Sequence, residues 1–279
     1  MNQISPRHAT ERPGYVLAQL NYTRAGGEKP AVYMYETPGP HPSIEERNEP
    51  HQVAIHSARP VLETLSLDVH GFAYARGTTA VRDFDDAAQL RDIYDAEVAA
   101  LVKAKTGARH ALVFDHTVRR IGGTDSNAST RAPVHVAHND YTKKSGPQRV
   151  RDLLPAGEAE QALKRRFSIV NVWRSINGPV LDTPLALADA RTVAEEDWIA
   201  TDLKYPDRTG EVYRIAFNPA HRWLYVPHLQ ADEILLLKTF DSDETGIARY
   251  APHTAFRDPA TKPGTEKRQS IESRVLAFF

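Results

Sequence analysis

The sequence predicts a mainly β protein with flanking helices, folded as an antiparallel sandwich or barrel. From Phe167 to Phe278 the chain reads as short segments rich in β-branched and aromatic residues, separated by Pro, Gly or Asp turns. These segments do not alternate with helices, which disfavours a parallel sheet of the Rossmann type. A glycine-rich phosphate loop, a serine nucleophile elbow and a His-Glu-x-x-His motif are all absent from the sequence.

Composition narrows the class of protein further. The 279 residues are 41% hydrophobic and 25% charged, as in an ordinary globular domain, and the net charge is -1. This balance offers no general attraction to nucleic acid or to a membrane surface. Cysteine is absent, which excludes disulfides, cysteine-ligated zinc, iron–sulfur clusters and thiol catalysis. No apolar run is long enough for a membrane span or a secretory signal. We therefore expect one cytoplasmic domain over residues 1–279 that binds neither nucleic acid nor membrane; its oligomeric state is open, a homodimer included.

The first part of the chain predicts little regular structure. Residues 1–50 are rich in Pro, Gly and charge, and we expect an irregular N-terminal arm with a short extended piece at Tyr15–Tyr22. His70–Arg76 alternates and predicts a strand with its aromatic residues on one face.

One long helix is predicted from Asp83 to Lys105. Its apolar residues recur at helical spacing and form one stripe: Leu90, Tyr94, Val98, Leu101 and Val102. Asp83 or Asp85 would cap its N-terminus, and Gly107 stands where a left-handed residue ends a helix. A second helical segment, 143–166, is polar and predicts an insertion between two strands of the barrel.

A candidate metal site begins in His135–Thr142, which alternates like a strand. Residues two apart on a strand point to the same face, so His138 and Asp140 could reach one metal ion. With a second histidine from a distant strand they would form the two-histidine, one-carboxylate triad of non-haem iron oxygenases.

The second histidine has three candidates late in the chain. His221 lies in a turn, His228 follows a proline at the end of a strand, and His253 lies inside the β-like segment 249–256. A histidine at any of these places is also compatible with a purely structural role.

A cationic strand face follows at the end of the chain. Arg268, Ser270, Glu272 and Arg274 share one face by the period of two, where apolar residues would be usual. Arg268 with Ser270 could hold a carboxylate, the arginine as a bidentate fork, and Arg274 is the second choice. The loop 258–264 predicts that this strand and the His253 segment form a hairpin.

The combination of His-x-Asp, a distal histidine and Arg-x-Ser, in this order, is what a double-stranded β-helix (jelly-roll, cupin-like) oxygenase requires. The sequence resembles the hydroxylase/desaturase family of bacterial and fungal secondary metabolism, with relatives of the cephamycin 7α-methoxylation hydroxylase component, the gibberellin desaturase and an endoperoxide-forming meroterpenoid oxygenase. The motifs that carry the resemblance cover roughly residues 65–279: 114–120, 135–142, 172–174, 189–191, 232–233, 240–242, 252–256 and 268–274.

The resemblance implies an Fe(II)/2-oxoglutarate-dependent dioxygenase that uses O2, with His138, Asp140 and His253 as iron ligands. It implies oxidation of a small secondary metabolite by hydroxylation, desaturation or cyclisation, with succinate and CO2 as co-products. Residues that we expect to contact the substrate flank these motifs: Tyr141, His116, Arg119, Trp173 and Arg174.

Two other functions fit the same fold. A cupin-like hydrolase or isomerase would use the barrel with another metal and would not need Arg268 and Ser270. A non-catalytic barrel could serve as the partner of a biosynthetic enzyme, although such a partner would have no use for the three candidate ligands.

Overall fold

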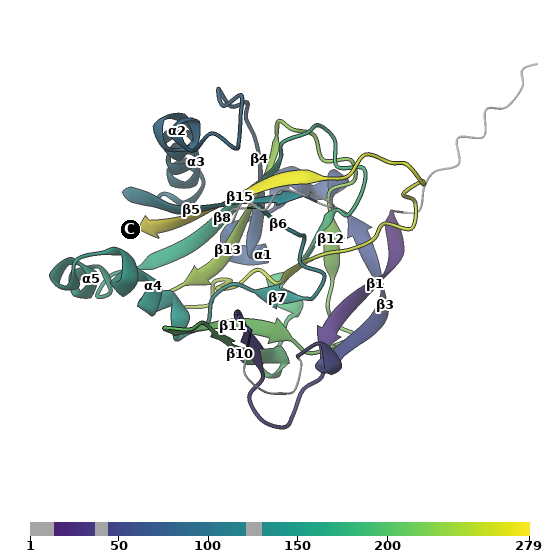
Figure 1. The fold of residues 1–279 in the computed structure, drawn as a ribbon, viewed down its shortest axis with the longest axis horizontal. Coiled ribbons are helices and arrows are strands. Elements are labelled where there is room, and N and C mark those ends of the chain that lie inside the picture. The colour runs from purple at the N-terminus through teal and green to yellow at the C-terminus, as the bar shows by residue number, and fades with distance from the viewer. Residues whose placement is uncertain (1–13, 37–43, 121–129) are drawn as a thin grey trace, which may run out of the picture.

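The computed structural model describes residues 14–36, 44–120 and 130–279, and two β-sheets dominate it (Figure 1). One sheet has nine strands in the order β1, β3, β12, β9, β14, β7, β11, β10, β2, and the other has six in the order β4, β13, β8, β15, β5, β6. The strands of the nine-stranded sheet are β1 (Tyr15–Thr23), β3 (Asn48–Ser57), β12 (Trp223–Tyr225), β9 (Leu185–Ala188), β14 (His253–Ala255), β7 (His138–Asn139), β11 (Thr209–Ile215), β10 (Trp198–Lys204) and β2 (Ala31–Tyr33). Those of the six-stranded sheet are β4 (Phe72–Arg76), β13 (Glu233–Asp241), β8 (Phe167–Ser175), β15 (Gln269–Phe278), β5 (His110–Arg120) and β6 (Thr130–Arg131).

Most neighbouring strands pair antiparallel, and the chain passes repeatedly from one sheet to the other. β7 and β14, for example, belong to the nine-stranded sheet, whereas β8, β13 and β15 belong to the six-stranded one. Two facing sheets built by such crossing form the jelly-roll, or double-stranded β-helix, and the predicted fold class is confirmed.

The predicted hairpin between the His253 segment and the last strand is wrong. β14 lies in the nine-stranded sheet and β15 in the six-stranded sheet, so the loop between them crosses the barrel. A loop of this composition is compatible with either connection. Only the pairing partners of the two strands, which are far away in the chain, decide between them.

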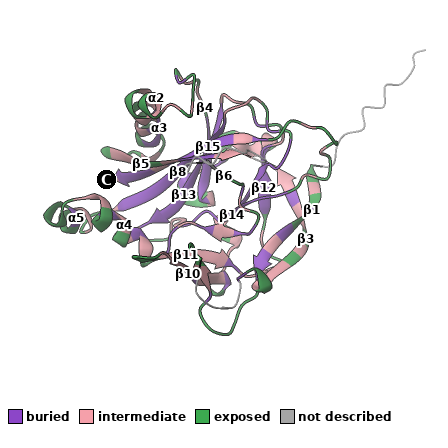
Figure 2. Ribbon diagram, in the orientation of Figure 1, coloured by how far each residue is buried: buried purple, intermediate pink, exposed green. Residues whose placement is uncertain are grey.

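The core between the sheets positions the functional residues. Trp173, Leu235 and Leu237 of the six-stranded sheet pack with Leu187 and Leu224 of the nine-stranded sheet in one apolar cluster. The central strands β8 and β13 are buried along their whole length, while β1, β3 and the helices are partly exposed (Figure 2).

The predicted long helix covers the outer face of the six-stranded sheet. It runs as α2 (Ala87–Gln89), a π-helical turn (Leu90–Tyr94) and α3 (Asp95–Thr106), and its buried residues Tyr94, Val98 and Val102 contact the sheet. Gly107 ends it in the left-handed conformation, at φ 77°. The N-cap is Asp86, whose carboxylate accepts from two backbone N–H groups, rather than the expected Asp83 or Asp85.

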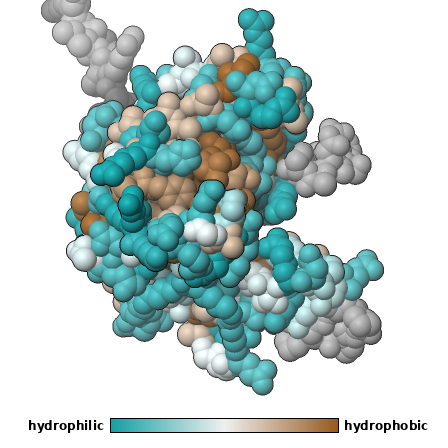
Figure 3. Space-filling view, turned by 90° about the vertical axis from the view of Figure 1, so that its left-hand side faces the viewer, coloured by the Kyte–Doolittle hydropathy of each residue, from teal (hydrophilic) through white to brown (hydrophobic). Residues whose placement is uncertain are grey.

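The segment 143–166 contains the two helices α4 (Ser145–Leu153) and α5 (Ala156–Ala162), between β7 and β8. They lie on the side of the molecule that Figure 3 turns to the viewer, where one apolar area is surrounded by hydrophilic side chains. No helix among the described residues is long and apolar enough to cross a membrane. The remaining helical turns are short: α1 (Leu67–His70) and the 3-10 turns at 44–47, 59–64, 190–192 and 195–197.

The N-terminal region is more regular than the expected arm. β1 pairs with β3 along nine residue pairs, and its side chains Leu20 and Tyr22 are buried in the outer core of the nine-stranded sheet. Alternating burial along β1 stabilises it as a full strand.

Candidate metal centre

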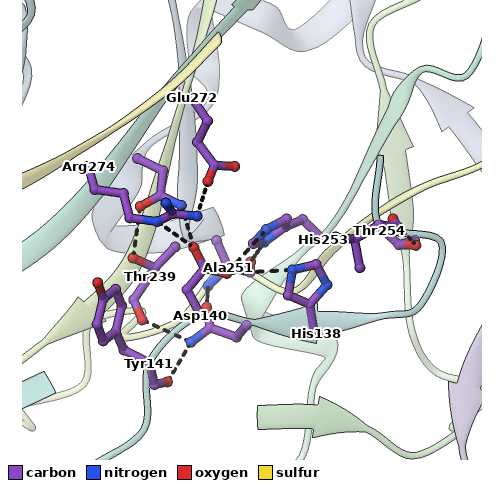
Figure 4. Close-up of polar contacts among 12 residues, drawn as sticks. His138, Asp140, Tyr141, Thr239, Ala251, His253, Thr254, Glu272 and Arg274 are labelled. Atoms are coloured by element: carbon purple, nitrogen blue, oxygen red, sulfur yellow. Dashed lines mark hydrogen bonds and ion pairs between the residues drawn. The ribbon is translucent and has the colours of Figure 1, made fainter. Parts of the chain in front are cut away.

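β7 and β14 bring two histidines together at the centre of the nine-stranded sheet. His138 and His253 are directly paired, and their ring centroids lie 4.4 Å apart. Asp140 follows β7 in a bend, with its Oδ1 3.5 Å from His138 Nε2 and 4.0 Å from His253 Nε2 (Figure 4). β7 has only two residues, so the long strand expected over 135–142 is not formed, yet the spacing of two still directs both side chains to one point.

Hydrogen bonds to the backbone orient both imidazole rings. His138 Nδ1 donates to the carbonyl of Val136 at 2.8 Å, and His253 Nδ1 donates to the carbonyl of Ala251 at 2.9 Å. A carbonyl can only accept, so Nδ1 carries the hydrogen in each ring and the lone pair is on Nε2. Both Nε2 atoms point toward Asp140 Oδ1, which is the arrangement that metal-binding histidines adopt.

Asp140 is held through the oxygen that faces away from the histidines. Its Oδ2 accepts from Asn171 Nδ2 at 2.8 Å and from Arg274 Nε at 3.2 Å. Burial by itself raises the pKa of Asp140. The opposite effect of Arg274 and the two imidazoles is larger and holds this pKa well below its ordinary value. The carboxylate is therefore ionised and offers Oδ1 to a cation.

His253 is neutral over the ordinary pH range. Burial and the neighbouring His138 lower its pKa to about 4. Three ligand atoms, two imidazole nitrogens and one carboxylate oxygen, lie within 4.8 Å of one another. This donor set fits Fe(II) with an open side, because no fourth protein ligand completes the cluster among the described residues.

Asn139 ties the two ligand-bearing segments together. Its buried amide donates to the carbonyls of Tyr141 and Thr239, and its Oδ1 accepts from the backbone N–H of Ala251. One side chain therefore sets the position of β7 relative to the segment that precedes His253.

Arg268, which immediately precedes β15, and Ser270 of β15 enter the barrel and leave donors unused. Arg268 donates to the carbonyl of Thr183 at 2.6 Å, while its Nε and the Ser270 hydroxyl are buried without a hydrogen-bond partner among the described residues. The guanidinium lies 5.3 Å from the ring centre of Trp173. Burial and then Arg119 lower the pKa of Arg268 to about 10, against the opposing effect of Glu272 and Asp182. An anion bound here would accept hydrogen bonds from the unsatisfied donors and would compensate the buried charge of Arg268. The two residues therefore fit the carboxylate of a cosubstrate.

Arg274 has a different environment. Besides Asp140, it donates to Thr117 Oγ1 at 3.1 Å and forms ion pairs with Asp115 and Glu272 (Figure 4). Its guanidinium is thus engaged by the protein on every nitrogen.

Three of the expected substrate contacts lie near the centre. Tyr141 is buried next to the triad, and burial raises its pKa to about 12. Arg119 donates to the carbonyl of Ala132 and lies 3.9 Å from Glu272. Trp173 faces the core between the sheets, beside Arg268.

His116 and Arg174 lie on the other face of the six-stranded sheet, contrary to our expectation. His116 hydrogen-bonds Asp95 of α3 and Ser273, each at 2.8 Å. Arg174 donates to the carbonyls of Gly77 and Ala231. The alternation of each strand directs these side chains to the helix layer, because the neighbours Thr117 and Trp173 face inward.

Asn171 and Glu272 belong to the centre although we had not assigned them a role. Asn171 binds Asp140, and Glu272 binds Arg274. The period of two places Asn171 on the same face of β8 as Trp173, and this was the only sign of its position in the sequence.

Comparison with known proteins assigns the family. A family model described as "Oxidoreductase/YMDC permease-like domain" matches residues 20–278. The chain is 31% identical over 263 residues to the Fe(II)/2-oxoglutarate-dependent dioxygenase nvfI of Aspergillus novofumigatus, covering 90% of this chain and 92% of that protein. The chain belongs to this family of Fe(II)/2-oxoglutarate-dependent oxygenases. It is also 31% identical over 300 residues to the hydroxylase/desaturase CTB9 of Cercospora beticola, covering 99% of this chain and 90% of that protein.

Solved structures of Fe(II)/2-oxoglutarate-dependent oxygenases share the fold. The iron and alpha-ketoglutarate-dependent endoperoxidase NvfI superposes with a TM-score of 0.84 at 27% identity, over 95% of this chain and 98% of that one. A second structure of NvfI, in a different conformation, gives a TM-score of 0.86. The predicted fold, enzyme class and cofactors, Fe(II), 2-oxoglutarate and O2, are confirmed.

Proposed function

We propose that His138, Asp140 and His253 bind the iron of this oxygenase and that Arg268 with Ser270 binds the distal carboxylate of 2-oxoglutarate. The observation that carries the second assignment is the pair of buried donors without partners, Arg268 Nε and Ser270 Oγ. Buried polar groups in proteins are nearly always satisfied, so two such donors two residues apart at the start of β15 indicate a ligand between the sheets.

Arg268 is favoured over Arg274 by what each guanidinium already binds. Arg274 is neutralised by Asp140, Asp115 and Glu272, and its removal would free the Asp140 carboxylate. Among the described residues, Arg268 has a single acceptor, the carbonyl of Thr183. A carboxylate would therefore gain charge-assisted hydrogen bonds from Arg268 without displacing another anion.

The residues of the protein orient the reacting groups and limit the access of water to them. When bound, the ferrous ion with 2-oxoglutarate and O2 supplies the oxidation of an unactivated C–H bond, with succinate and CO2 as co-products. His138 and His253 present Nε2 because Nδ1 is held by a carbonyl. Arg274 and Asn171 keep Asp140 ionised and aligned, and the apolar core between the sheets excludes water from the centre.

We further propose a small secondary metabolite as the substrate, oxidised by hydroxylation, desaturation or cyclisation. The printed names of the relatives support this range, since they include hydroxylase/desaturases and an endoperoxidase. We expect Tyr141, Arg119 and Trp173, which lie near the centre, to contact this substrate. The shared core of both sheets supports a single catalytic domain, and the lack of cysteine is in keeping with a cytoplasmic enzyme.

The assignment is tested by anaerobic titration. Fe(II) followed by 2-oxoglutarate should produce a weak visible metal-to-ligand charge-transfer band. Arg268→Ala should weaken 2-oxoglutarate binding by about 10-fold or more with iron affinity little changed, whereas Arg274→Ala should weaken iron binding. The opposite pattern would assign the cosubstrate to Arg274, and the absence of the band with iron bound would contradict the proposed function.

A further inference from the structure

Arg214 of β11 lies beside the metal centre but binds none of its three candidate ligands. It pairs directly with His138, which in turn pairs with His253. Directly opposed residues of antiparallel strands project to the same face, with Cβ atoms roughly 5 Å apart. Arg214 therefore rises from the inner face of the nine-stranded sheet, next to a metal ligand.

Within the described part of the chain, the Arg214 guanidinium is not bound by any other group. Although the residue is partly buried, no hydrogen bond or ion pair among the described residues engages its guanidinium. Every other arginine in the described ranges that is not exposed forms at least one such contact, as Arg119, Arg166, Arg268 and Arg274 do.

Burying the Arg214 guanidinium without a partner raises the free energy of the ligand-free protein. Burial lowers the pKa of Arg214, and Glu45 is the one charge that acts in the opposite direction. Glu45 itself is exposed. A structural arginine at a similar depth is normally paired, because an unpaired buried cation loses its hydration without compensation. A desolvated guanidinium is instead the group that binds carboxylates well.

Apart from the two histidines, the residues in the same row as Arg214 are apolar. Ile199 of β10 is its paired residue on the other side, and Leu187 is the next residue beyond His253 in the same row. The row thus reads Ile199, Arg214, His138, His253, Leu187, with a single cation beside the histidines.

We propose that Arg214 binds a carboxylate of the organic substrate, so that this enzyme acts on apolar scaffolds that carry a carboxylic acid. This inference rests on the proposed function of the centre. The distal carboxylate of 2-oxoglutarate is not the ligand that we assign to Arg214, because Arg268 and Ser270, which we propose to bind it, enter from the opposite sheet.

The test uses a fluorescent probe acid and its uncharged amide. 2-Naphthoate and 2-naphthamide are titrated into anaerobic enzyme that holds Fe(II) and 2-oxoglutarate, and binding is followed by fluorescence anisotropy. The wild type should bind the acid about 10-fold or more tightly than the amide. Arg214→Gln should lose this preference, Arg214→Lys should retain part of it, and the exposed Arg222→Gln, which removes the same charge, should behave as the wild type.

The affinity for 2-oxoglutarate is measured in each variant from the charge-transfer band. An unchanged 2-oxoglutarate affinity in Arg214→Gln, with loss of the acid preference, supports the inference. Equal binding of acid and amide by the wild type, no saturable binding of the acid at millimolar concentrations, or a lost 2-oxoglutarate affinity in Arg214→Gln would each overturn it. If the wild type itself does not bind 2-oxoglutarate, it is the proposed function that is wrong, independently of the naphthoate result.

Discussion

At the scale of single residues, the centre works by giving each ligand one occupied and one free atom. The carbonyls of Val136 and Ala251 occupy Nδ1 of the two histidines, while Asn171 and Arg274 occupy one oxygen of Asp140. The remaining three atoms are directed to one point before any metal arrives. Such outer contacts commonly change metal affinity by about 10- to 100-fold.

Asn171→Ala should therefore weaken Fe(II) binding by about 10-fold, because Asp140 Oδ2 loses a donor and the carboxylate is freer to turn. The measurement is an anaerobic metal titration with circular dichroism to verify folding. Asn218→Ala is the matched control, since the Asn218 amide also donates to a carboxylate, that of Asp197, away from the triad. Equal iron affinity of the two variants would contradict the positioning role of Asn171.

His253→Ala should abolish iron binding while the protein remains folded, because its Nε2 is one of only three ligand atoms in the cluster. Metal analysis after gel filtration checks this outcome. The exposed His110→Ala should bind iron as the wild type does. A His253→Ala protein that retains one equivalent of iron would remove this residue from the ligand set.

At the scale of elements, very short strands carry the chemistry. β7 has two residues and β14 three, so few ladder hydrogen bonds hold them. The Asn139 side chain adds three hydrogen bonds to these few: its amide donates to the carbonyls of Tyr141 and Thr239, and its oxygen accepts from the N–H of Ala251. The ligand-bearing elements are thus held by a side chain as well as by strand pairing.

Asn139→Ala should lower the free energy of unfolding by about 3 kcal/mol, because it leaves buried donors and acceptors unsatisfied at about 1–3 kcal/mol each. Urea unfolding of the metal-free protein checks the value. Asn177→Ala, at a partly exposed position, should cost clearly less. Similar unfolding midpoints for the two variants would show that Asn139 does not hold the segments together.

At the scale of the whole molecule, a partly buried ion pair, in which only the carboxylate is fully buried, joins the two sheets. Glu233 begins β13 of the six-stranded sheet, and Arg59 follows β3 of the nine-stranded sheet and also donates to the carbonyl of Pro227. Burial by itself raises the pKa of Glu233, but hydrogen bonds from Arg59, the Gln230 backbone and Tyr74 bring it down to about 2.

This lowered pKa predicts acid sensitivity of the native state. A carboxyl whose pKa is lower in the folded protein stabilises it above the unfolded pKa, and the contribution is lost as the pH falls from about 4.5 to about 2. Glu233→Gln should cost about 3 kcal/mol at neutral pH and progressively less toward pH 2. Urea midpoints measured over this range test the prediction; a constant difference between the two proteins would contradict it.

Local sequence patterns determined much of this protein. The β-rich second half, the helix that ends at Gly107, the His-x-Asp spacing and the unusual polar face of Arg268, Ser270, Glu272 and Arg274 follow from periods of two and of 3.6, which depend only on backbone geometry. These patterns also made His138 and Asp140 candidate ligands and left His221, His228 and His253 as candidates for the third position; the resemblance to the oxygenase family implied His253.

Only the tertiary structure decided which residues meet. β14 and β15 joined different sheets because their partners lie far away in the chain, and the alternation of β5 and β8 could not by itself say which face is inside. His116 and Arg174 therefore lay toward the helices, where Asp95 and backbone carbonyls bind them. Arg214 became the neighbour of His138 through a long-range strand pairing, and Arg274 became the partner of Asp140 across the barrel, 134 residues away in the chain. Long-range pairing is set by burial of the whole core, which a local pattern does not contain.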